Sequence, residues 1–282
     1  MMPDSKQKNL PGLSAVLIGR DEAHHLNKTI PPLIEIADEV VFVDTGSQDS
    51  TVDLATQLGC WVAQVPWQDD FSLAKNHAVD LAKHAWILNV DCDEELTIDQ
   101  AARDFRAVLD SIDAVPAYRV RIENLNANGE IQPSEAIRLF RNDPVIRFRN
   151  PVHESVADSV YEQWRGFRPM LAGFVLRHYG YLGNLNQDKI KRNVMILRRW
   201  IEQEPDSVYG NYKLGMNLLF LGSESEAVFF LKQSFEALNA AADRMSYPFA
   251  EKLITTLATA LMRQGRAQEV EDIKLKVARW TS

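Results

Sequence analysis

Residues 40–59 read VVFVDTGSQDSTVDLATQLG, and this stretch decides the fold of the N-terminal part of the chain. It opens with β-branched and aromatic residues, which are typical of a strand that is covered on both faces. Asp44 ends the apolar run, and residues 49–53 supply side chains that can cap a helix. The helix is predicted to reach Leu58 and to end at Gly59. The stretch therefore predicts a strand, a polar loop and a helix in succession.

Similar units surround this stretch. Apolar runs that predict strands lie at residues 13–18, 60–65 and 85–90. Residues 71–83 place their apolar side chains on one helical face. Pro31 and Pro32 lie in the first connection, and we expect them to break the helix there. Strands that alternate with helices in this way predict an α/β fold with a parallel sheet.

The middle of the chain has another pattern. A helix is expected at residues 97–111, followed by strands at 117–124 and 136–141 around a turn at 126–129. Residues 142–184 are rich in Arg, Pro and Gly and have no clear periodicity. Irregular stretches of this length are more often functional than idle.

After residue 184 the chain is predicted to be wholly helical. Leu214, Gly222 and Leu231 belong to a helix–turn–helix spacing that recurs, for example at Leu257 and Gly265. The spacing resembles degenerate tetratricopeptide repeats. Either a plain helical cap or a peptide-binding superhelix would fit. We therefore expect a flexible tail at residues 1–11, an α/β domain at 12–184 and a helical domain at 185–282.

Charge and composition exclude several classes of protein. The net charge is −8, and residues 1–110 hold 19 acidic and 8 basic residues, a balance of −11. This excess argues against a broad nucleic-acid surface. The first ten residues lack the apolar stretch of a secretory signal, and we expect no transmembrane segment, because no apolar run approaches the length needed to span a bilayer. Its two cysteines form no disulfide framework, so we expect a cytoplasmic protein, with peripheral contact to the inner face of the membrane left open.

Acidic side chains follow three of the predicted strands. They lie at residues 20–22, 44–47 and 91–95. In an α/β sheet, ligands bind beyond the carboxyl ends of the strands. Asp91 and Asp93 can therefore share a hard cation with the oxygens of a diphosphate. The alternative is that solvated loops carry these charges without a ligand.

The chain resembles the family 2 inverting glycosyltransferases of the GT-A fold. The resemblance rests on residues 40–59, on DDFSLAKNHAV at 69–79 and on WILNVDCDEEL at 86–96. It covers residues 12–180 and, through the repeats, extends to the subgroup with tetratricopeptide-like C-terminal helices. It implies a Rossmann-like GT-A domain that transfers a hexose from a nucleotide-diphosphate sugar, UDP-linked, to a glycan, a lipid-linked saccharide or a peptide.

The resemblance also implies residues for the donor. Asp44 would contact the base or the ribose, with Asp21 and Glu22 nearby. Family members often have Lys-Asn-Glu where this chain has Arg-Asp-Glu, so the acidic partner is retained while the base contact differs. Lys75 matches a basic residue near the nucleotide, and Asp91 would bridge to the ribose or the metal. The alternative for Lys75 is a surface lysine of a helix.

The later motifs, at residues 138–156 and 176–183, imply the rest of the site. Glu154 is the predicted base that deprotonates the acceptor, and His153 is the alternative or a neighbour that positions it. The metal, Mn²⁺ or Mg²⁺, would be bound by Asp93, Asp91 and His178. Arg138 would stabilise the diphosphate leaving group, or else pair with the acidic half of the chain.

Two other functions compete with sugar transfer. A sugar-phosphate nucleotidyltransferase would use a related sheet and a magnesium ion, but its glycine-rich first loop does not match residues 19–28, which contain one glycine. An adaptor that has lost its activity would have no need of the acidic motifs. A homodimer formed through the helical region is a further expectation.

Overall fold

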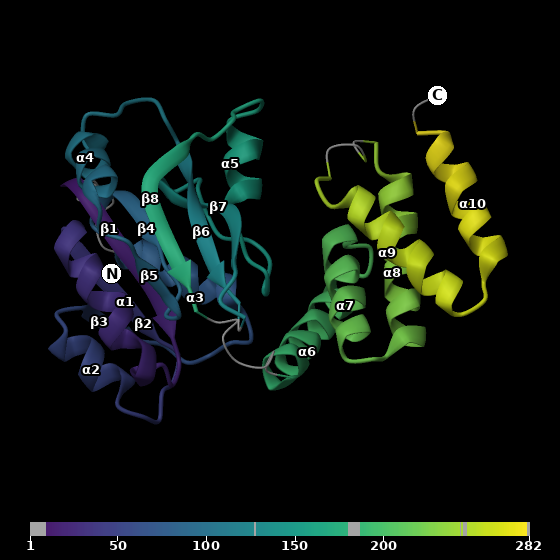
Figure 1. Cartoon of the computed structure of the whole chain (residues 1–282), viewed down its shortest axis with the longest axis horizontal. Coiled ribbons are helices and arrows are strands. Elements are labelled where there is room, and N and C mark those ends of the chain that lie inside the picture. The colour runs from purple at the N-terminus through teal and green to yellow at the C-terminus, as the bar shows by residue number, and fades with distance from the viewer. Residues whose placement is uncertain (1–9, 127, 180–186, 243, 245–246, 281–282) are drawn as a thin grey trace. The chain divides into compact units, whose positions relative to one another are not determined.

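The computed structural model describes residues 10–126, 128–179, 187–242, 244 and 247–280. The chain divides into two compact units, residues 1–185 and 186–282 (Figure 1). The first unit contains a mixed sheet with helices, and the second contains helices in the part that the structure describes. Residues 1–9 of the predicted tail and the domain boundary at residue 184 lie outside the described residues.

The first unit is built on one eight-stranded sheet with the order β3-β2-β1-β4-β7-β6-β8-β5. The strands β1 to β4 are parallel to one another, β7 is antiparallel to β4 and β6, and β8 runs parallel to β6 and antiparallel to β5. The strand bounds are β1 Leu10–Gly19, β2 Glu39–Asp44, β3 Trp61–Gln64, β4 His84–Asn89, β5 Glu94–Leu96, β6 Ala117–Leu125, β7 Ile131–Arg141 and β8 Leu171–His178.

Helices cover both faces of this sheet, as the apolar runs predicted. The helices α1 (Ala23–Ile36), α2 (Thr51–Gln57) and α4 (Gln100–Leu109) pack into one core, and α3 (Phe71–Leu81) and α5 (Ala157–Gln163) pack into the other (Figure 1). Along β4, Trp86 and Leu88 belong to the first core, whereas Ile87 belongs to the second. Side chains of a strand alternate between faces, so a strand covered on both must be apolar throughout.

The prediction that Pro31 and Pro32 break the first helix is wrong, because α1 runs through both prolines. Leu26 and Ile30 lie before the second proline and Leu33 follows it, and all three are fully buried on one face of the helix. Packing of this continuous apolar face against the sheet outweighs the backbone hydrogen bonds that the prolines cannot donate.

The structure differs from the sequence-based prediction at two further places, the start of the first unit and the stretch 142–184. Leu10 and Pro11, assigned to the tail from sequence, begin β1, where the amide of Leu10 donates to the carbonyl of Lys83 at 3.1 Å. The stretch 142–184, expected to be irregular, contains α5 and the strand β8. Every second residue in the centre of β8 is buried, which matches a strand with one face on the core. The predicted turn at 126–129 includes residue 127, which lies outside the described residues.

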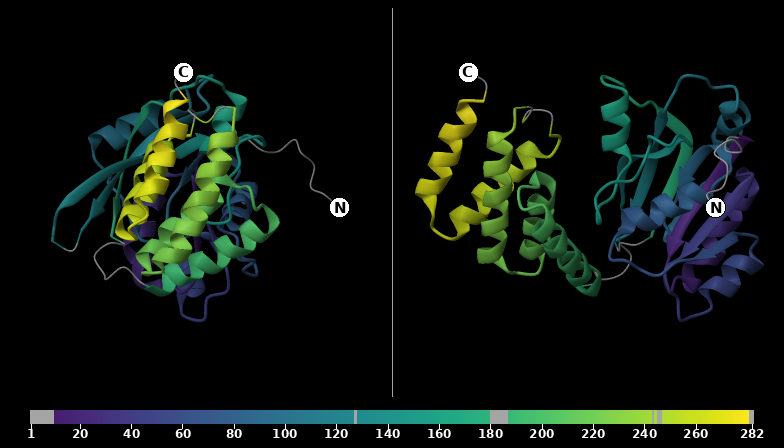
Figure 2. Two further views of the ribbon diagram at one scale, coloured as in Figure 1. Left: turned by 90° about the vertical axis from the view of Figure 1, so that its right-hand side faces the viewer. Right: turned by 180° about the vertical axis from the view of Figure 1, so that it is seen from behind.

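The second unit has its own core and confirms the predicted helical repeats (Figure 2). Its helices are α6 Gln187–Gln203, α7 Val208–Phe220, α8 Glu224–Ala240, α9 Ala250–Arg263 and α10 Ala267–Ala278. Gly222 and Gly265 follow α7 and α9, and both have the left-handed φ (78° and 71°) that favours glycine after a helix. Gly215 of α7 lets α8 approach, because a Cβ there would lie 2.6 Å from Cγ of Leu231.

Within the part of the chain that the structure describes, no helix combines the length and the apolar character needed to cross a bilayer.

Candidate active site

The loops that follow β1 and β2 are joined to each other by hydrogen bonds. The amide of Asp21 donates to Oγ of Ser47 at 2.9 Å, and Oδ1 of Asp21 accepts from the amide of Gln48 at 2.7 Å. The backbone of Asp21 has a φ of 58°, in the left-handed region, which turns its carboxylate back to the second loop. The amide of Glu22 donates to Oγ1 of Thr51 at 2.8 Å. The two loops therefore form one rigid edge beyond the parallel strands.

Asp44 holds the second of these loops in shape. Its side chain is fully buried, and its carboxylate accepts from the amides of Gly46 and Ser47, each at 3.1 Å, and from the hydroxyl of Ser47. Three donors from its own loop thus satisfy much of its hydrogen-bonding capacity. Its contact with a base or a ribose remains a prediction.

Glu22 lies beside two histidines of α1. Its Oε2 is 3.9 Å from Nε2 of His25, and the ring centroids of His24 and His25 are 3.9 Å apart. These three residues place one potential ligand atom each within 4.8 Å of one another. From the sequence, His24 and His25 were assigned no chemistry. The predicted role of Glu22 beside the nucleotide remains untested.

Lys75 is a buried cation and not a surface lysine of the helix. It is 5% exposed, and its Nζ lies 2.9 Å from Oδ1 of Asp91 and 2.7 Å from Oε1 of Glu154. Burial alone would lower its pKa, but Asp91 and Glu154 raise that pKa above its ordinary value. Lys75 therefore stays charged and joins the loop after β4 to the segment before α5.

Two contacts of α3 bring that segment to Lys75. Asp70 caps the helix by accepting from the amide of Leu73 at 3.0 Å. The side chain of Asn76 donates to the carbonyl of Phe148 at 2.9 Å and accepts from its amide at 2.8 Å. Together these bonds fix α3 against residue 148, six residues before Glu154.

Asp91 faces a second cation as well. Its Oδ2 lies 2.7 Å from Nη2 of Arg138, which is also 3.0 Å from Oε1 of Glu94. Burial raises the pKa of Asp91, but Arg138 and Lys75 together bring it well below its ordinary value. Since each oxygen of Asp91 faces a cation, the carboxylate is poorly placed to share a metal ion in this arrangement. Its assignment as a metal ligand remains a prediction.

Glu94 belongs to this network, although it was not singled out from the sequence. It is 2% exposed, and its Oε2 accepts from the amide of Asp91 at 2.9 Å. Burial raises the pKa of Glu94 above its ordinary value, while Arg138 acts in the opposite direction. Glu94 therefore orients both Arg138 and the backbone of Asp91. Arg138, predicted to contact the diphosphate, pairs with the acidic half of the chain in this structure, which is the alternative weighed for it.

Asp93 and His178 form a second, separate pair. Oδ2 of Asp93 lies 3.4 Å from Nε2 of His178, and both side chains are 20% exposed. Nδ1 of His178 is 2.9 Å from Oδ1 of Asn124. Burial lowers the pKa of His178, but Asp93 and the neighbouring acids raise it above its ordinary value. When the imidazole is neutral, a hydrogen bond to Asn124 places the proton on Nδ1 and leaves Nε2 to bind a cation.

Pairing of β5 with β8 creates this second pair. The two strands are antiparallel, with Glu94 opposite His178, and the amide of Tyr179 donates to the carbonyl of Asp93 at 3.0 Å. The register of β8 on β6 then sets His178 beside Asn124. Sequence reasoning did not identify Asn124, whose only signal is its position at the end of a predicted strand.

The predicted bases lie next to each other but in different surroundings. The side chain of Glu154 is 14% exposed and contacts Lys75. His153 is exposed, and its backbone φ is 58°. The contact with Lys75 joins Glu154 to the buried network. The assignment of the base stays a prediction.

This sheet and its acidic edge define a Rossmann-like GT-A domain with a helical C-terminal region. The profile of glycosyl transferase family 2 matches residues 14–158, which is more than half of the chain. The chain belongs to this family, as the motifs predicted.

Individual relatives support the same assignment. The chain is 36% identical over 235 residues to a TPR repeat-containing protein of Synechococcus elongatus, covering 79% of this chain and 56% of the relative. It is 32% identical over 155 residues to an uncharacterized glycosyltransferase of Rickettsia bellii, covering 52% of each. The chain thus spans about half the length of the curated relatives it matches.

Solved structures share the fold. Residues 1–349 of TarS of S. aureus, in complex with UDP, superpose with a TM-score of 0.53 at 13% identity, over 95% of this chain and 91% of that TarS chain. The same protein with UDP-GlcNAc gives a TM-score of 0.50 at 15% identity, with the same coverage.

Proposed function

We propose that the protein is a metal-dependent, inverting glycosyltransferase that transfers a hexose from a UDP-linked donor. One observation carries the proposal. Asp93, which forms a partly exposed pair with His178, lies two residues after Asp91, whose network includes Glu154. A place for a cation and a candidate base are thus held by one sheet edge. Family membership and the UDP complexes of TarS support the donor class.

Asp93 and His178 fit a divalent cation, Mn²⁺ or Mg²⁺. They offer one carboxylate oxygen and one imidazole nitrogen, and both remain accessible. Mixed oxygen and nitrogen donors suit Mn²⁺, whereas Mg²⁺ favours oxygen alone, so we expect the stronger response to Mn²⁺. The chemistry that such a cation supplies when bound is neutralisation of charge on the departing diphosphate.

Glu154 is our candidate for the base. Lys75 contacts its Oε1, which fixes the carboxylate and leaves Oε2 for the acceptor. Glu154 takes the proton of the acceptor hydroxyl, and the hydroxyl oxygen forms a bond to the anomeric carbon. Attack comes from the face opposite the diphosphate. The bond from that carbon to the diphosphate oxygen breaks, and its electron pair leaves with the nucleotide.

The remaining residues serve the donor in this proposal. Asp44, with Asp21 and Glu22 beside it, shapes the loop edge that would receive the base and the ribose. Lys75 and Arg138 place two buried cations next to Asp91, where they offset negative charge near the diphosphate. The acceptor is a glycan, a lipid-linked saccharide or a peptide. A cytoplasmic location, peripheral membrane contact and a homodimer stay predictions.

The test compares two substitutions in the full chain, Asp93→Asn and Glu154→Gln, with Asp53→Asn as a control on the exposed face of α2. UDP release from a panel of UDP-sugars is measured with Mn²⁺, with Mg²⁺ and with chelator. Asp93→Asn should lose Mn²⁺-stimulated turnover and bind Mn²⁺ more weakly by electron paramagnetic resonance. Glu154→Gln should bind UDP and Mn²⁺ normally but transfer about 10²–10⁴-fold more slowly.

Several outcomes would contradict the proposal. Full Mn²⁺-dependent turnover by Asp93→Asn would exclude Asp93 as a ligand of the cation. A product that retains the donor's anomeric configuration by NMR would exclude inversion. Pyrophosphate release from a nucleoside triphosphate and a sugar phosphate would favour a nucleotidyltransferase. Absence of any UDP-dependent thermal stabilisation with Mn²⁺ would favour an inactive adaptor.

A further inference from the structure

Three potential metal ligands gather where α1 begins. Oε2 of Glu22 lies 3.9 Å from Nε2 of His25, and His24 adds a second imidazole, whose ring centroid is 3.9 Å from that of His25. One ligand atom from each of the three residues lies within 4.8 Å of the other two. Among the residues that the structure describes, no other group of three carboxylates, imidazoles or thiols meets this condition. We call Glu22, His24 and His25 the α1 cluster.

Hydrogen bonds hold the backbone of the α1 cluster in place. The amide of Glu22 donates to Oγ1 of Thr51 at 2.8 Å, and its carbonyl accepts from the amide of His25 at 2.9 Å. One turn after His25, Oγ1 of Thr29 donates to the carbonyl of Cys92 at 2.5 Å, which fixes α1 to the loop after β4. The ligands thus stand on ordered backbone, so an ion can bind by turning side chains alone.

The distances within the α1 cluster suit a tetrahedral ion after small rotations of the side chains. Zn²⁺ binds nitrogen and oxygen at about 2.0–2.2 Å, so two of its tetrahedral ligand atoms lie about 3.4 Å apart. The separation of 3.9 Å between Glu22 and His25 exceeds this by only about 0.5 Å. The side chains of Glu22 and His25 are 26% and 29% exposed, and His24 is exposed. Such side chains can turn, and a fourth position on the ion stays open to water.

The donor atoms of the α1 cluster favour a transition-metal ion over Mg²⁺. They comprise two imidazole nitrogens and one carboxylate oxygen. Imidazole suits Zn²⁺, Ni²⁺ and Cu²⁺, whereas Mg²⁺ and Ca²⁺ prefer oxygen alone. Residues 1–110, with 19 acidic and 8 basic residues, add a negative field that attracts cations. The α1 cluster therefore differs in metal preference from the pair of Asp93 and His178, which has a single imidazole.

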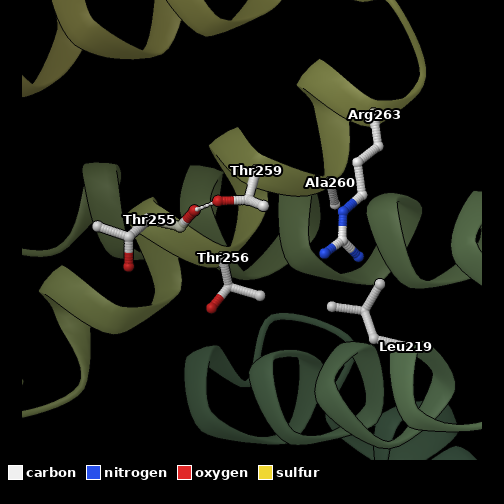
Figure 3. Close-up of a pocket in the computed structure, with 6 residues that line it drawn as sticks. All are labelled: Leu219, Thr255, Thr256, Thr259, Ala260 and Arg263. Carbon is white, nitrogen blue, oxygen red and sulfur yellow. Dashed lines mark hydrogen bonds between the residues drawn. The ribbon is translucent and has the colours of Figure 1, made fainter.

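The cavity of the helical unit offers no comparable donors. It has a volume of about 300 Å³, lies between α7 and α9, and is lined by Leu219, Thr255, Thr256, Thr259, Ala260 and Arg263 (Figure 3). These residues supply hydroxyl groups and one guanidinium, but no carboxylate or imidazole. We therefore expect Zn²⁺ to bind at the α1 cluster and not at this cavity.

We propose that Glu22, His24 and His25 bind Zn²⁺, at a site separate from the proposed Mn²⁺ pair. The ion is held by a carboxylate oxygen of Glu22 and one ring nitrogen of each histidine, and water completes the tetrahedron. Bound Zn²⁺ links the residue that caps α1 to the first turn of this helix. Because the unfolded chain lacks this arrangement, Zn²⁺ stabilises the folded state. This inference does not depend on the proposed transfer reaction.

The experiment titrates Zn²⁺ into the untagged full chain by isothermal titration calorimetry. A second series carries Asp93→Asn, which removes the proposed Mn²⁺ ligand and should still bind Zn²⁺ at the α1 cluster. In both series, His24→Asn and His25→Asn should each weaken Zn²⁺ binding at least about tenfold, because even the hydrogen-bond partner of a metal ligand is worth about 10–100-fold. His77→Asn, which removes an exposed histidine of α3, should leave the affinity unchanged.

Chemical modification locates the bound ion. Zn²⁺ should protect His24 and His25 from diethylpyrocarbonate and leave His77 reactive, as followed by mass spectrometry. Equal Zn²⁺ affinities of His24→Asn and His77→Asn, or protection confined to His178, would overturn the proposal. Displacement of Zn²⁺ by an equal concentration of Mg²⁺ would also overturn it. Circular dichroism checks that each variant is folded. Since no readout is turnover, failure of the transferase proposal is recognised separately.

Discussion

Replacing Lys75 by Met tests whether the stability of the buried network depends on the positive charge of Lys75. The substitution keeps a side chain of similar volume but removes the positive charge that lies between Asp91 and Glu154. Glu154 then loses its ion-pair partner, while Asp91 keeps Arg138 at 2.7 Å. The expected effect is a loss of stability in the unit that contains the sheet.

The magnitude follows from burial. Removing one partner of a buried ion pair typically costs about 3–5 kcal/mol. The side chain of Asp91 is 36% exposed and retains one cation, so the lower end of this range applies, about 3 kcal/mol. For a unit of this size, that corresponds to a fall in Tm of about 6–12 °C.

The pH dependence has a definite sign. In the native protein the low pKa of Asp91 adds stability above its ordinary pKa of 3.8, and this stability is lost as the pH falls through the folded-state value. Without Lys75 the folded-state pKa of Asp91 rises, so the folded variant takes up a proton at higher pH. The stability deficit of Lys75→Met should therefore stay constant near neutral pH and shrink only as the pH falls toward and below 3.8, the ordinary pKa of Asp91.

The assay is calorimetry of the full chain, with Lys83→Met as an exposed control and Lys75→Arg as a charge-conserving one. The double variant Lys75→Met with Glu154→Gln should be less destabilised than the sum of the two single variants. A Tm of Lys75→Met equal to that of the Lys83→Met control would refute this explanation. So would a stability deficit of Lys75→Met that does not change on acidification.

Three further outcomes are expected. Asp44→Ala, which deprives the loop after β2 of its buried acceptor, should lower the free energy of unfolding by about 2–4 kcal/mol in urea titrations. Cys60, whose pKa burial raises to about 12, and Cys92, whose pKa burial also raises, should resist iodoacetamide at mildly alkaline pH until the protein is unfolded, as followed by mass spectrometry. Gly215→Ala should destabilise the helical unit by about 1–3 kcal/mol in thermal melts despite its better helix propensity, because the added methyl meets Leu231.

Much of the fold could be predicted because its strands carry local signals. Each of β1, β2 and β4 is apolar on both faces and ends at polar residues, so the run alone predicts a strand in a parallel sheet. By contrast, β8 is buried only at alternate positions and contains Gly173 and Arg177. Its identity depends on pairing with β6 and β5, which a local pattern does not reveal. The continuity of α1 through its prolines likewise depends on tertiary packing.

The residues of the candidate site likewise fall into two groups, those that could be predicted from the sequence and those that could not. Asp44, Asp91 and Asp93 follow strands, so their gathering at one edge could be predicted from the chain alone. Glu94 and Asn124 could not be assigned roles, because these arise from strand pairing and from Arg138 of a distant strand. The sequence pattern of α3 also does not predict that Lys75 is buried, because a lysine on an amphipathic helix is normally solvated.

The pairing of β5 with β8 has a consequence for how the site assembles. The loops after β1, β2 and β4 are joined by parallel strands within the first ninety residues, and all of them lie inside the segment that family 2 shares. Asp93 belongs to that segment, whereas His178 lies beyond it. The partner of Asp93 is therefore set by β8, a strand that lies outside the segment that the family profile matches.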